Sequence, residues 1–247
     1  MDAEEGLARL RALGFAPADA RELWEHFDAA ERRGKPSHGH ARIPWLERLD
    51  GYDPRAEPVL REVAEGLQRW HGNGALGYLV LARVVRAQLE HPPARARLVV
   101  CERTFPTGML GLHVRRLAEG GLVGLLTATS PRRLGSPSGG PKLAGTNPLA
   151  IGIPSSGGDP VVADVSMGAV TWGDVVAGLA SEEQLVPFGG EQAHKAFALA
   201  LALQLLVDSL VREEGHGAVL LVARPQADPV PALRRLAAGV RLPGDPR

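Results

Sequence analysis

The chain has 247 residues, of which 28 are basic and 28 acidic, so its formal net charge is zero. A balanced charge gives no broad electrostatic attraction for nucleic acid or an anionic membrane, and we expect neither as a partner. The single cysteine, Cys101, excludes an internal disulfide and a cysteine-based zinc or iron–sulfur centre, and it favours a reducing, cytoplasmic compartment.

The first predicted elements are two short helices over residues 4–14 and 17–34, where apolar residues recur at helical spacing and a glycine ends each run. They lead directly into the stretch "PSHGHARIP" at residues 36–44. The acidic, amphipathic start shows neither the basic region nor the apolar centre of a secretory signal, so we expect it to belong to the mature protein.

Beyond a proline-rich connection, helical and strand patterns alternate along the chain. Predicted helices cover 73–90, 109–119 and about 191–214, and predicted strands cover 97–101, 121–129, 147–154, 160–165 and 217–223. A final helix is predicted after Asp228, which caps it, and Pro229, which starts it. The alternation predicts an α/β protein.

The long C-terminal helix contains the most apolar run of the chain, "AFALALALQLLVDSLV" at residues 196–211. Gln204 and Asp208 interrupt this run, and it is too short to cross a bilayer. Its apolar residues occur on nearly every side, which is too broad a surface for the outside of a monomer. We therefore predict that a second subunit covers part of it in a two-fold homodimer, with Leu203 and Leu206 as outward positions.

We divide the chain into three regions. Residues 1–70 form a helical region that carries Ser-His-Gly, residues 71–186 form a central α/β region for cofactor and substrate, and residues 187–247 form a helix-strand-helix region that packs back on the first. The Gly- and Ser-rich stretch at 135–145 is too short for a linker and is interpreted as a working loop. Neither the dinucleotide fingerprint nor the phosphate-loop signature occurs, so a standard Rossmann fold is not expected.

His38 is the first candidate for chemistry. Its imidazole ordinarily titrates near neutrality, and it is suited to donate a proton to a developing alkoxide. Ser37, its neighbour, is a candidate to orient the ring through the other nitrogen. The alternative is a solvated turn histidine that makes only local hydrogen bonds.

Arg42 follows His38 by one helical turn, and its planar guanidinium matches a carboxylate bidentately. Together the two side chains suit a small 2-oxo acid. The alternative for Arg42 is a surface salt bridge with Glu47 or Asp50.

Asp164 lies at the end of an apolar strand, where a carboxylate is costly unless it is paired. It is interpreted either as a buried carboxylate that orients His38 or as an ordinary turn cap, and the two interpretations stay open. Four other histidines have no acidic or histidine partner at metal-ligand spacing, so no metal site is predicted: His71, His113, His194 and His216.

Five motifs occur together, in one order, from the first helices to the C-terminal residues. They are "SHGHARIP" (37–44), "GTNPLAIGIP" (145–154), "PVVADVSMGAVTWGDV" (160–175), "PFGGEQAHKAFALAL" (187–201) and "RLPGD" (241–245). With them the chain resembles the malate/L-lactate dehydrogenase family of NAD(P)-dependent oxidoreductases. This type-2 group also includes ureidoglycolate, sulfolactate and ketimine reductases and is unrelated to the Rossmann lactate dehydrogenases.

The resemblance implies the fold of that family, a central mixed sheet with helices from both chain ends, usually as a dimer. It implies a hydride transfer between NAD or NADP and a small 2-hydroxy or 2-oxo acid, malate- or lactate-like, or the reduction of a cyclic ketimine carboxylate. His38 is then the proton donor, Ser37 and Asp164 its relay, and Arg42 the carboxylate-binding residue. Cofactor contacts are implied at Pro154, Ser155, Ser156, Gly189, Gly190, His194 and Lys195.

The chain also departs from the family pattern. "RTFPTGMLG" (103–111) stands where members carry His-His-Phe-Gly, "DVSMG" (164–168) stands where they carry Asp-x-Ala-Thr-Ser, and the stretch 178–187 is far shorter. These departures define the alternative hypothesis, a shortened and catalytically silent paralogue that keeps the fold to bind a small ligand or a partner.

Overall fold

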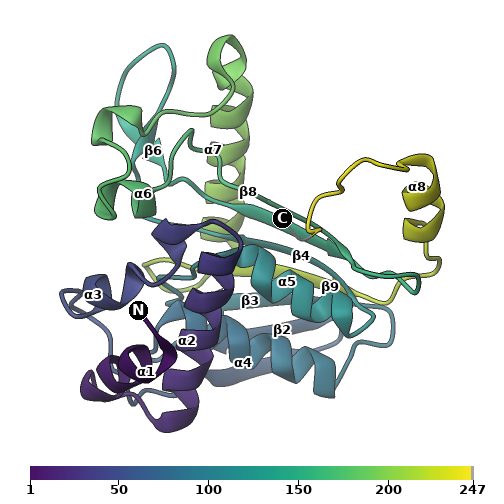
Figure 1. Ribbon diagram of the computed structural model, residues 1–247, viewed down its shortest axis with the longest axis horizontal. Helices are drawn as coiled ribbons and strands as arrows, with labels where there is room; N and C mark the ends of the chain where they lie inside the picture. The colour runs from purple at the N-terminus through teal and green to yellow at the C-terminus, as the bar shows by residue number, and fades with distance from the viewer. Residues whose placement is uncertain (246–247) are drawn as a thin grey trace.

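The computed structural model describes residues 1–245 and is built around one large mixed β-sheet (Figure 1). Its seven strands lie in the order β1-β2-β3-β9-β4-β7-β8. They are β1 (Val59–Ala64), β2 (Leu67–His71), β3 (Ala96–Glu102), β4 (Val123–Ala128), β7 (Leu149–Ile153), β8 (Val161–Val165) and β9 (Ala218–Ala223). Only the β2–β3 pair is parallel among these neighbours. The predicted α/β class with a central mixed sheet is therefore confirmed.

Helices α4 (Gly77–Glu90) and α5 (Leu110–Glu119) cover one face of this sheet and lie in front of it in Figure 1. Alternate residues of the strands, such as Val99, Leu126 and Leu220, are fully buried beneath them. Burial of each such side chain contributes about 1.5–3 kcal/mol. This core fixes the start of α5 against the end of β8, beside the site described below.

The N-terminal helices pack against the first turn of α4. The predicted pair corresponds to α1 (Ala3–Ala12), which Asp2 caps, and α2 (Pro17–Arg32). A five-residue helix, α3 (Arg42–Leu46), was not predicted because so short a run shows no periodicity. Fully buried side chains from α1, α2 and α4, with Tyr78 at the centre, form a second core.

A smaller lobe stands above the sheet in Figure 1. It contains the two-stranded pair β5 (Leu134–Gly135) and β6 (Lys142–Ala144), helix α6 (Trp172–Val176), short 3-10 turns at Glu182–Gln184 and Gly190–Gln192, and the long helix α7 (Ala193–Leu210). Leu203 of α7 packs here against Leu134 and Met167 and is 7% exposed. The expectation that Leu203 points outward is therefore wrong, whereas Leu206 is 43% exposed.

The C-terminal region is distributed over the molecule rather than gathered on the N-terminal helices. β9 is inserted between β3 and β4, and α8 (Val230–Leu236) lies at the edge of the molecule beyond β8 (Figure 1). The C-terminal region meets the N-terminal one at the β1–β2 hairpin, where Arg61 pairs with Glu213 and Arg69 donates to the Leu210 carbonyl. Contacts between the two regions are thus seen at this hairpin, and the division of the chain into three regions stays a prediction. β9 is hydrogen-bonded to β3 on one side and to β4 on the other, and this pairing holds the C-terminal region within the sheet.

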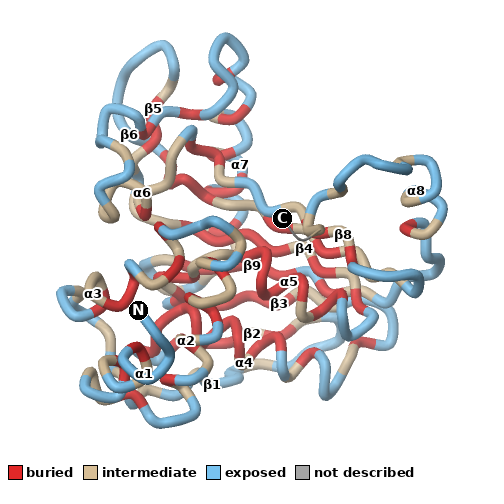
Figure 2. Tube along the Cα trace, viewed as in Figure 1, coloured by how far each residue is buried: buried red, intermediate tan, exposed pale blue. Residues whose placement is uncertain are grey.

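The second face of the sheet is apolar and only partly covered. One register row across it consists of Leu98, Leu221, Leu125, Ile151 and Ala163. α7 packs against β4, and Val219 of β9 is buried, but Leu221 remains 40% exposed. Figure 2 shows that buried residues otherwise concentrate in the sheet and in the helices in front of it.

Candidate active site

A cavity of about 170 Å³ lies where the small lobe meets the sheet and the N-terminal helices. His38, Arg42 and Asp164, three of the predicted site residues, line it together. Its walls also include the loop before α5, the segments after β4 and before β7, and the start of α6. Such a volume suits a small acid rather than a whole dinucleotide.

The His38 segment is held by α2. After α2 ends, Gly34 adopts a left-handed conformation and Pro36 starts the 3-10 turn Pro36–His38. The His40 amide then donates to the Glu31 carboxylate at 3.0 Å, and the His40 ring stacks on Trp24. This local order places Ser37 and His38 at the cavity edge without help from distant strands.

The imidazole of His38 is bonded through Nδ1. The distance from Ser37 Oγ to His38 Nδ1 is 3.1 Å, and Ser37 is buried. Burial alone raises the pKa of Asp174, but hydrogen bonds from the hydroxyl of Ser37 and from Thr171 outweigh it, so the pKa of this carboxyl is lowered. Because Ser37 donates to Asp174, its oxygen accepts from His38 Nδ1–H. The hydrogen-bonded relay of Asp174, Ser37 and His38 therefore engages Nδ1 and leaves Nε2 as the ring nitrogen available to a ligand.

His38 is neutral in this environment. Burial, with the nearby charge of Arg42, lowers the pKa of His38 to about 4. A neutral imidazole with its proton on Nδ1 has a lone pair on Nε2, so it is ready to accept a proton. The alternative of a solvated turn histidine does not fit a ring that is bonded to a buried serine.

Arg42 is a buried guanidinium without a carboxylate partner. It is 7% exposed, it lies 4.8 Å from the centroid of the Trp45 ring, and no acidic group in residues 1–245 lies within ion-pair distance of it. Its Nε–H has no hydrogen-bond partner in that range either. Glu47, the suggested surface partner, instead holds Arg9 through two bonds of 2.7 Å. Since an unpaired buried charge is costly, this arrangement favours an anionic ligand.

Asp164 lines the cavity, but its carboxylate accepts a hydrogen bond from α5 and not, as one interpretation expected, from the His38 relay. Its Oδ2 accepts a 2.7 Å hydrogen bond from the Gly111 amide at the start of α5. Burial raises the pKa of this carboxyl, against the opposing effect of that bond. The carboxylate bonded to Ser37 is Asp174, which sequence reasoning missed. The only local signal for it was the Thr-x-x-Asp pattern at 171–174, which forms the capping box of α6.

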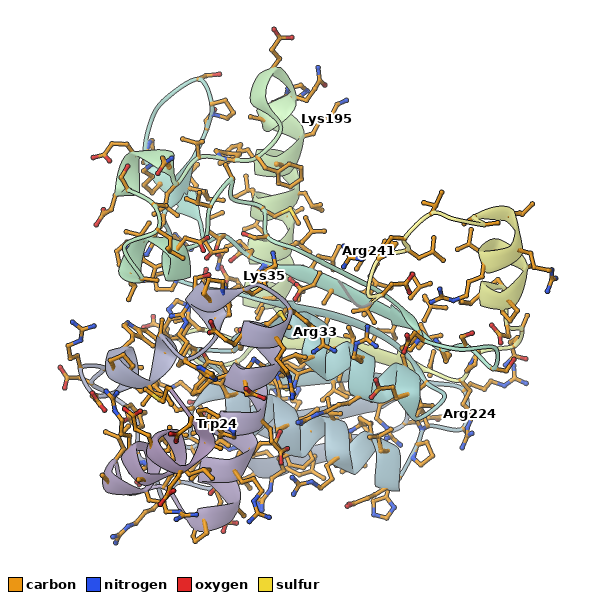
Figure 3. The ribbon with its side chains drawn as sticks, viewed as in Figure 1. Trp24, Arg33, Lys35, Lys195, Arg224 and Arg241 are labelled. Carbon is orange, nitrogen blue, oxygen red and sulfur yellow. The ribbon has the colours of Figure 1, made fainter. Side chains whose placement is uncertain are left out.

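The seven predicted cofactor residues do not line this cavity. Ser156 donates through its amide and its hydroxyl to Asp228 ahead of α8, at 2.7 Å each. Lys195 lies at the far end of α7, well away from Lys35 at the cavity (Figure 3). The set Pro154, Ser155, Ser156, Gly189, Gly190, His194 and Lys195 is thus split between two regions, and its cofactor role stays a prediction.

The cavity itself offers surface for a flat ring. Phe105, Pro106, Pro131 and Pro148 line it, and the Tyr78 hydroxyl is buried at its wall without a hydrogen-bond partner among the described residues. An apolar wall and an unused hydroxyl fit a nicotinamide ring and its carboxamide. Within residues 1–245 no group of three or more His, Cys, Asp or Glu side chains is placed to hold a metal.

Comparison with known proteins identifies a matching family and several relatives. The family model described as malate/L-lactate dehydrogenase matches residues 5–185. Delta(1)-pyrroline-2-carboxylate reductase from Pseudomonas fluorescens is 30% identical over 232 residues, covering 80% of this chain and 66% of that protein. (2R)-3-Sulfolactate dehydrogenase (NADP(+)) from Chromohalobacter salexigens is 32% identical over 175 residues, covering 69% of this chain and 52% of that protein. This chain spans less than two thirds of the length of these curated relatives.

Among solved structures, the crystal structure of delta1-piperideine-2-carboxylate reductase from Pseudomonas syringae matches the fold with a TM-score of 0.83. The two chains are 26% identical, and the match covers 97% of this chain and 88% of the other. The overall fold described above is therefore shared with a solved reductase.

Proposed function

The chain belongs to the malate/L-lactate dehydrogenase family, and we propose that it is an oxidoreductase. It moves a hydride between a nicotinamide cofactor and a small 2-hydroxy or 2-oxo acid, or reduces a cyclic ketimine carboxylate. The observation that carries the proposal is the unpaired, buried Arg42 beside the relay of His38 in one small cavity. A carboxylate and an adjacent proton-transfer site are what these substrates require.

In this mechanism Arg42 binds the substrate carboxylate and so holds the reacting carbon near His38. When bound, the nicotinamide supplies the hydride to the carbonyl or imine carbon. His38 Nε2 supplies the proton to the oxygen or nitrogen of that bond, so one hydride and one proton reduce it. In the reverse direction the neutral Nε2 removes the proton from the hydroxyl.

Substrate binding prepares His38 for the reductive direction. The positive charge of Arg42 contributes to the low pKa of His38. Burial is the larger cause of the low pKa, but a carboxylate bound to Arg42 offsets the charge of the arginine, which raises the pKa of the imidazole and makes protonation of Nε2 easier. Ser37 and Asp174 keep Nδ1 engaged in either state.

The ring of the cofactor would lie on the wall made by Phe105, Pro106, Pro131 and Pro148, with the Tyr78 hydroxyl for its carboxamide. NAD and NADP both remain as cofactors, although one relative has NADP(+) in its name. The test measures oxidation of NADH and NADPH with pyruvate, oxaloacetate, 2-oxoglutarate and cyclic imine carboxylates. Turnover of at least one pair is the expected result.

The second candidate is the catalytically silent paralogue that binds a small ligand. Its support is that the seven residues predicted to contact the cofactor do not line the cavity. Nicotinamide fluorescence separates the two candidates. Enhanced NADH or NADPH fluorescence, or a thermal shift at millimolar cofactor, supports the enzyme. Absence of both effects, together with no turnover, supports the silent protein.

The assembly proposed is a cytoplasmic homodimer that uses the free side of α7. Leu205 and Leu206 on that helix are 58% and 43% exposed, and Leu221 on the neighbouring sheet face is 40% exposed. By length and composition the segment Gly190–Leu210 is long and apolar enough to cross a membrane, so the expectation from the shorter run 196–211 that it is too short is wrong. One side of it packs in the small lobe against Leu134 and Met167, which supports a second subunit as the cover for the other side.

A further inference from the structure

The cavity has more positive charge than one monocarboxylate needs. Among the described residues, Lys35, Arg42 and Arg133 line it, against Asp164 in its wall and Asp174 behind Ser37, so positive charges outnumber negative ones. His38 adds no negative charge, and burial raises the pKa of Asp164, which favours its neutral form. In a chain whose formal net charge is zero, this local excess of cations indicates an anionic ligand.

Arg133 is held in place by its backbone and by a tryptophan. Its amide donates to the Ala144 carbonyl at 2.9 Å, next to the β5–β6 pair. Its guanidinium lies over the Trp172 ring, 3.4 Å from the centroid. Stacking on an aromatic face leaves the N–H groups at the edge of the guanidinium free for a planar anion.

Among the described residues, no carboxylate forms an ion pair with Arg133. Within residues 1–245 none lies at ion-pair distance from it, and its Nε–H is buried without a hydrogen-bond partner. Glu182 acts on it only as a longer-range charge. A structural arginine of this kind would be expected to have a carboxylate or a carbonyl on its N–H groups.

The two unpaired arginines contact consecutive residues of α6, Trp172 and Gly173. Arg133 stacks on Trp172, whereas Arg42 packs so closely against the backbone of Gly173 that a β-carbon there would overlap its Nη2. Both arginines line the same cavity of about 170 Å³. Two anionic groups of one small molecule can therefore be bound at once, one on each arginine.

We propose that Arg133 is a specificity-determining residue that binds a second anionic group of the substrate, at the end opposite the carboxylate on Arg42. The preferred substrate is then a short 2-hydroxy or 2-oxo acid that carries a second carboxylate or a sulfonate. This inference rests on the proposed function, and it selects one substrate class within it. A monoanion such as pyruvate or a cyclic imine carboxylate leaves Arg133 without a partner.

The test compares wild type with Arg133→Gln, which removes the charge but keeps a polar side chain. KM is measured for two dianions, oxaloacetate and 3-sulfopyruvate, and for two monoanions, pyruvate and Δ1-piperideine-2-carboxylate. Hydrogen bonds to charged groups predict that the variant raises KM for the dianions about tenfold to a hundredfold. KM for the monoanions should stay within about twofold, because they do not reach Arg133.

The neighbouring Arg132 is the matched control. It carries the same charge one position earlier, pairs with Asp208 and does not line the cavity. Arg132→Gln should leave every KM unchanged. An equal loss for dianions and monoanions in Arg133→Gln would mean a structural role and overturn the inference. A raised Kd for NADH or NADPH with an unchanged dianion preference would assign Arg133 to a cofactor phosphate and also overturn it.

An independent readout separates this inference from the proposed function. Malate and lactate are titrated into the protein while its tryptophan fluorescence is followed, since two of the four tryptophans, Trp45 and Trp172, line the cavity. Tighter binding of malate than of lactate in wild type, lost in Arg133→Gln, supports the second anion site even if no turnover is found. Equal binding of the two acids in wild type overturns it even if the enzyme is active.

Discussion

Arg42 occupies the space that any side chain on Gly173 would need, because a β-carbon built on Gly173 would overlap Arg42 Nη2. This contact joins the N-terminal segment to α6 at the cavity wall. It also explains why a glycine stands inside a helix, where alanine is ordinarily more stable by about 1 kcal/mol.

The first prediction is that Gly173→Ala impairs substrate binding without unfolding the protein. The new methyl group overlaps Arg42 Nη2 and, to a smaller extent, the Ser37 carbonyl oxygen, so it displaces the Arg42 guanidinium. KM for a 2-oxo acid should therefore rise roughly tenfold or more, as expected for a weakened charge-assisted pair. Steady-state kinetics and circular dichroism check it together. A variant with unchanged KM would show that Arg42 does not bind the substrate from this position.

The second prediction distinguishes the two aspartates. Asp174→Asn should lower kcat by about tenfold to a hundredfold, because the carboxylate accepts from both Thr171 and Ser37, and an amide whose oxygen keeps the Thr171 bonds turns its NH2 group towards Ser37. Asp164→Asn should cost less, since an amide oxygen still accepts from the Gly111 amide.

Thr171→Ala is the control for the second prediction, because Thr171 and Asp174 also cap α6. It weakens the helix cap but leaves the Ser37–Asp174 bond in place, so it should destabilise by about 1 kcal/mol and keep kcat. Equal loss of kcat in Asp164→Asn and Asp174→Asn would contradict this assignment.

The third prediction concerns the pH dependence of oxidation. The pKa of His38 is lowered to about 4, so its base form persists well below the usual range. The value of kcat/KM for a 2-hydroxy acid should therefore stay level from neutral pH down to about 5 and fall only near 4. His38→Gln should lower turnover about a hundredfold and leave cofactor affinity unchanged. A midpoint near 6.5 in wild type would mean that His38 is solvated.

The fourth prediction concerns acid stability. His113 is buried, and burial together with the nearby charge of Arg116 lowers its pKa to about 3, against a backbone hydrogen bond at Thr107 that raises it. Between pH 6.5 and 3 the unfolded chain binds a proton here that the folded chain does not, so stability falls as the pH falls. One such group changes the free energy of unfolding by about 1.4 kcal/mol per pH unit. His113→Phe should flatten this slope in urea unfolding from pH 7 to 4; an unchanged slope would contradict the prediction.

The fifth prediction concerns assembly. Leu205→Glu or Leu206→Glu places a charge on the exposed side of α7 and should convert a dimer to a monomer at micromolar concentration. Leu236→Glu on α8 is the control, since Leu236 is 87% exposed and should tolerate a charge. Light scattering measures the mass. A monomeric wild type, or recovery of wild type in the membrane fraction, would refute the dimer.

The sequence by itself determined the features that depend on neighbouring residues. Helical and strand periodicity located α2, α4, α5, α7 and most of the central strands, because side-chain burial repeats along each element. Ser37, His38 and Arg42 lie within one short segment, so their spacing alone predicted that they share a site, and all three meet at the cavity or its edge.

Only the tertiary structure decided which distant groups join them. Asp174 reaches Ser37, and Arg133 reaches the same cavity, because the small lobe folds back over the N-terminal segment. β9 enters the sheet between β3 and β4, although about a hundred residues separate it from both strands in the chain. It also decided that Leu203 is buried and that Asp164 binds the start of α5. Such contacts depend on strand order and lobe packing, which leave no periodic pattern in the sequence.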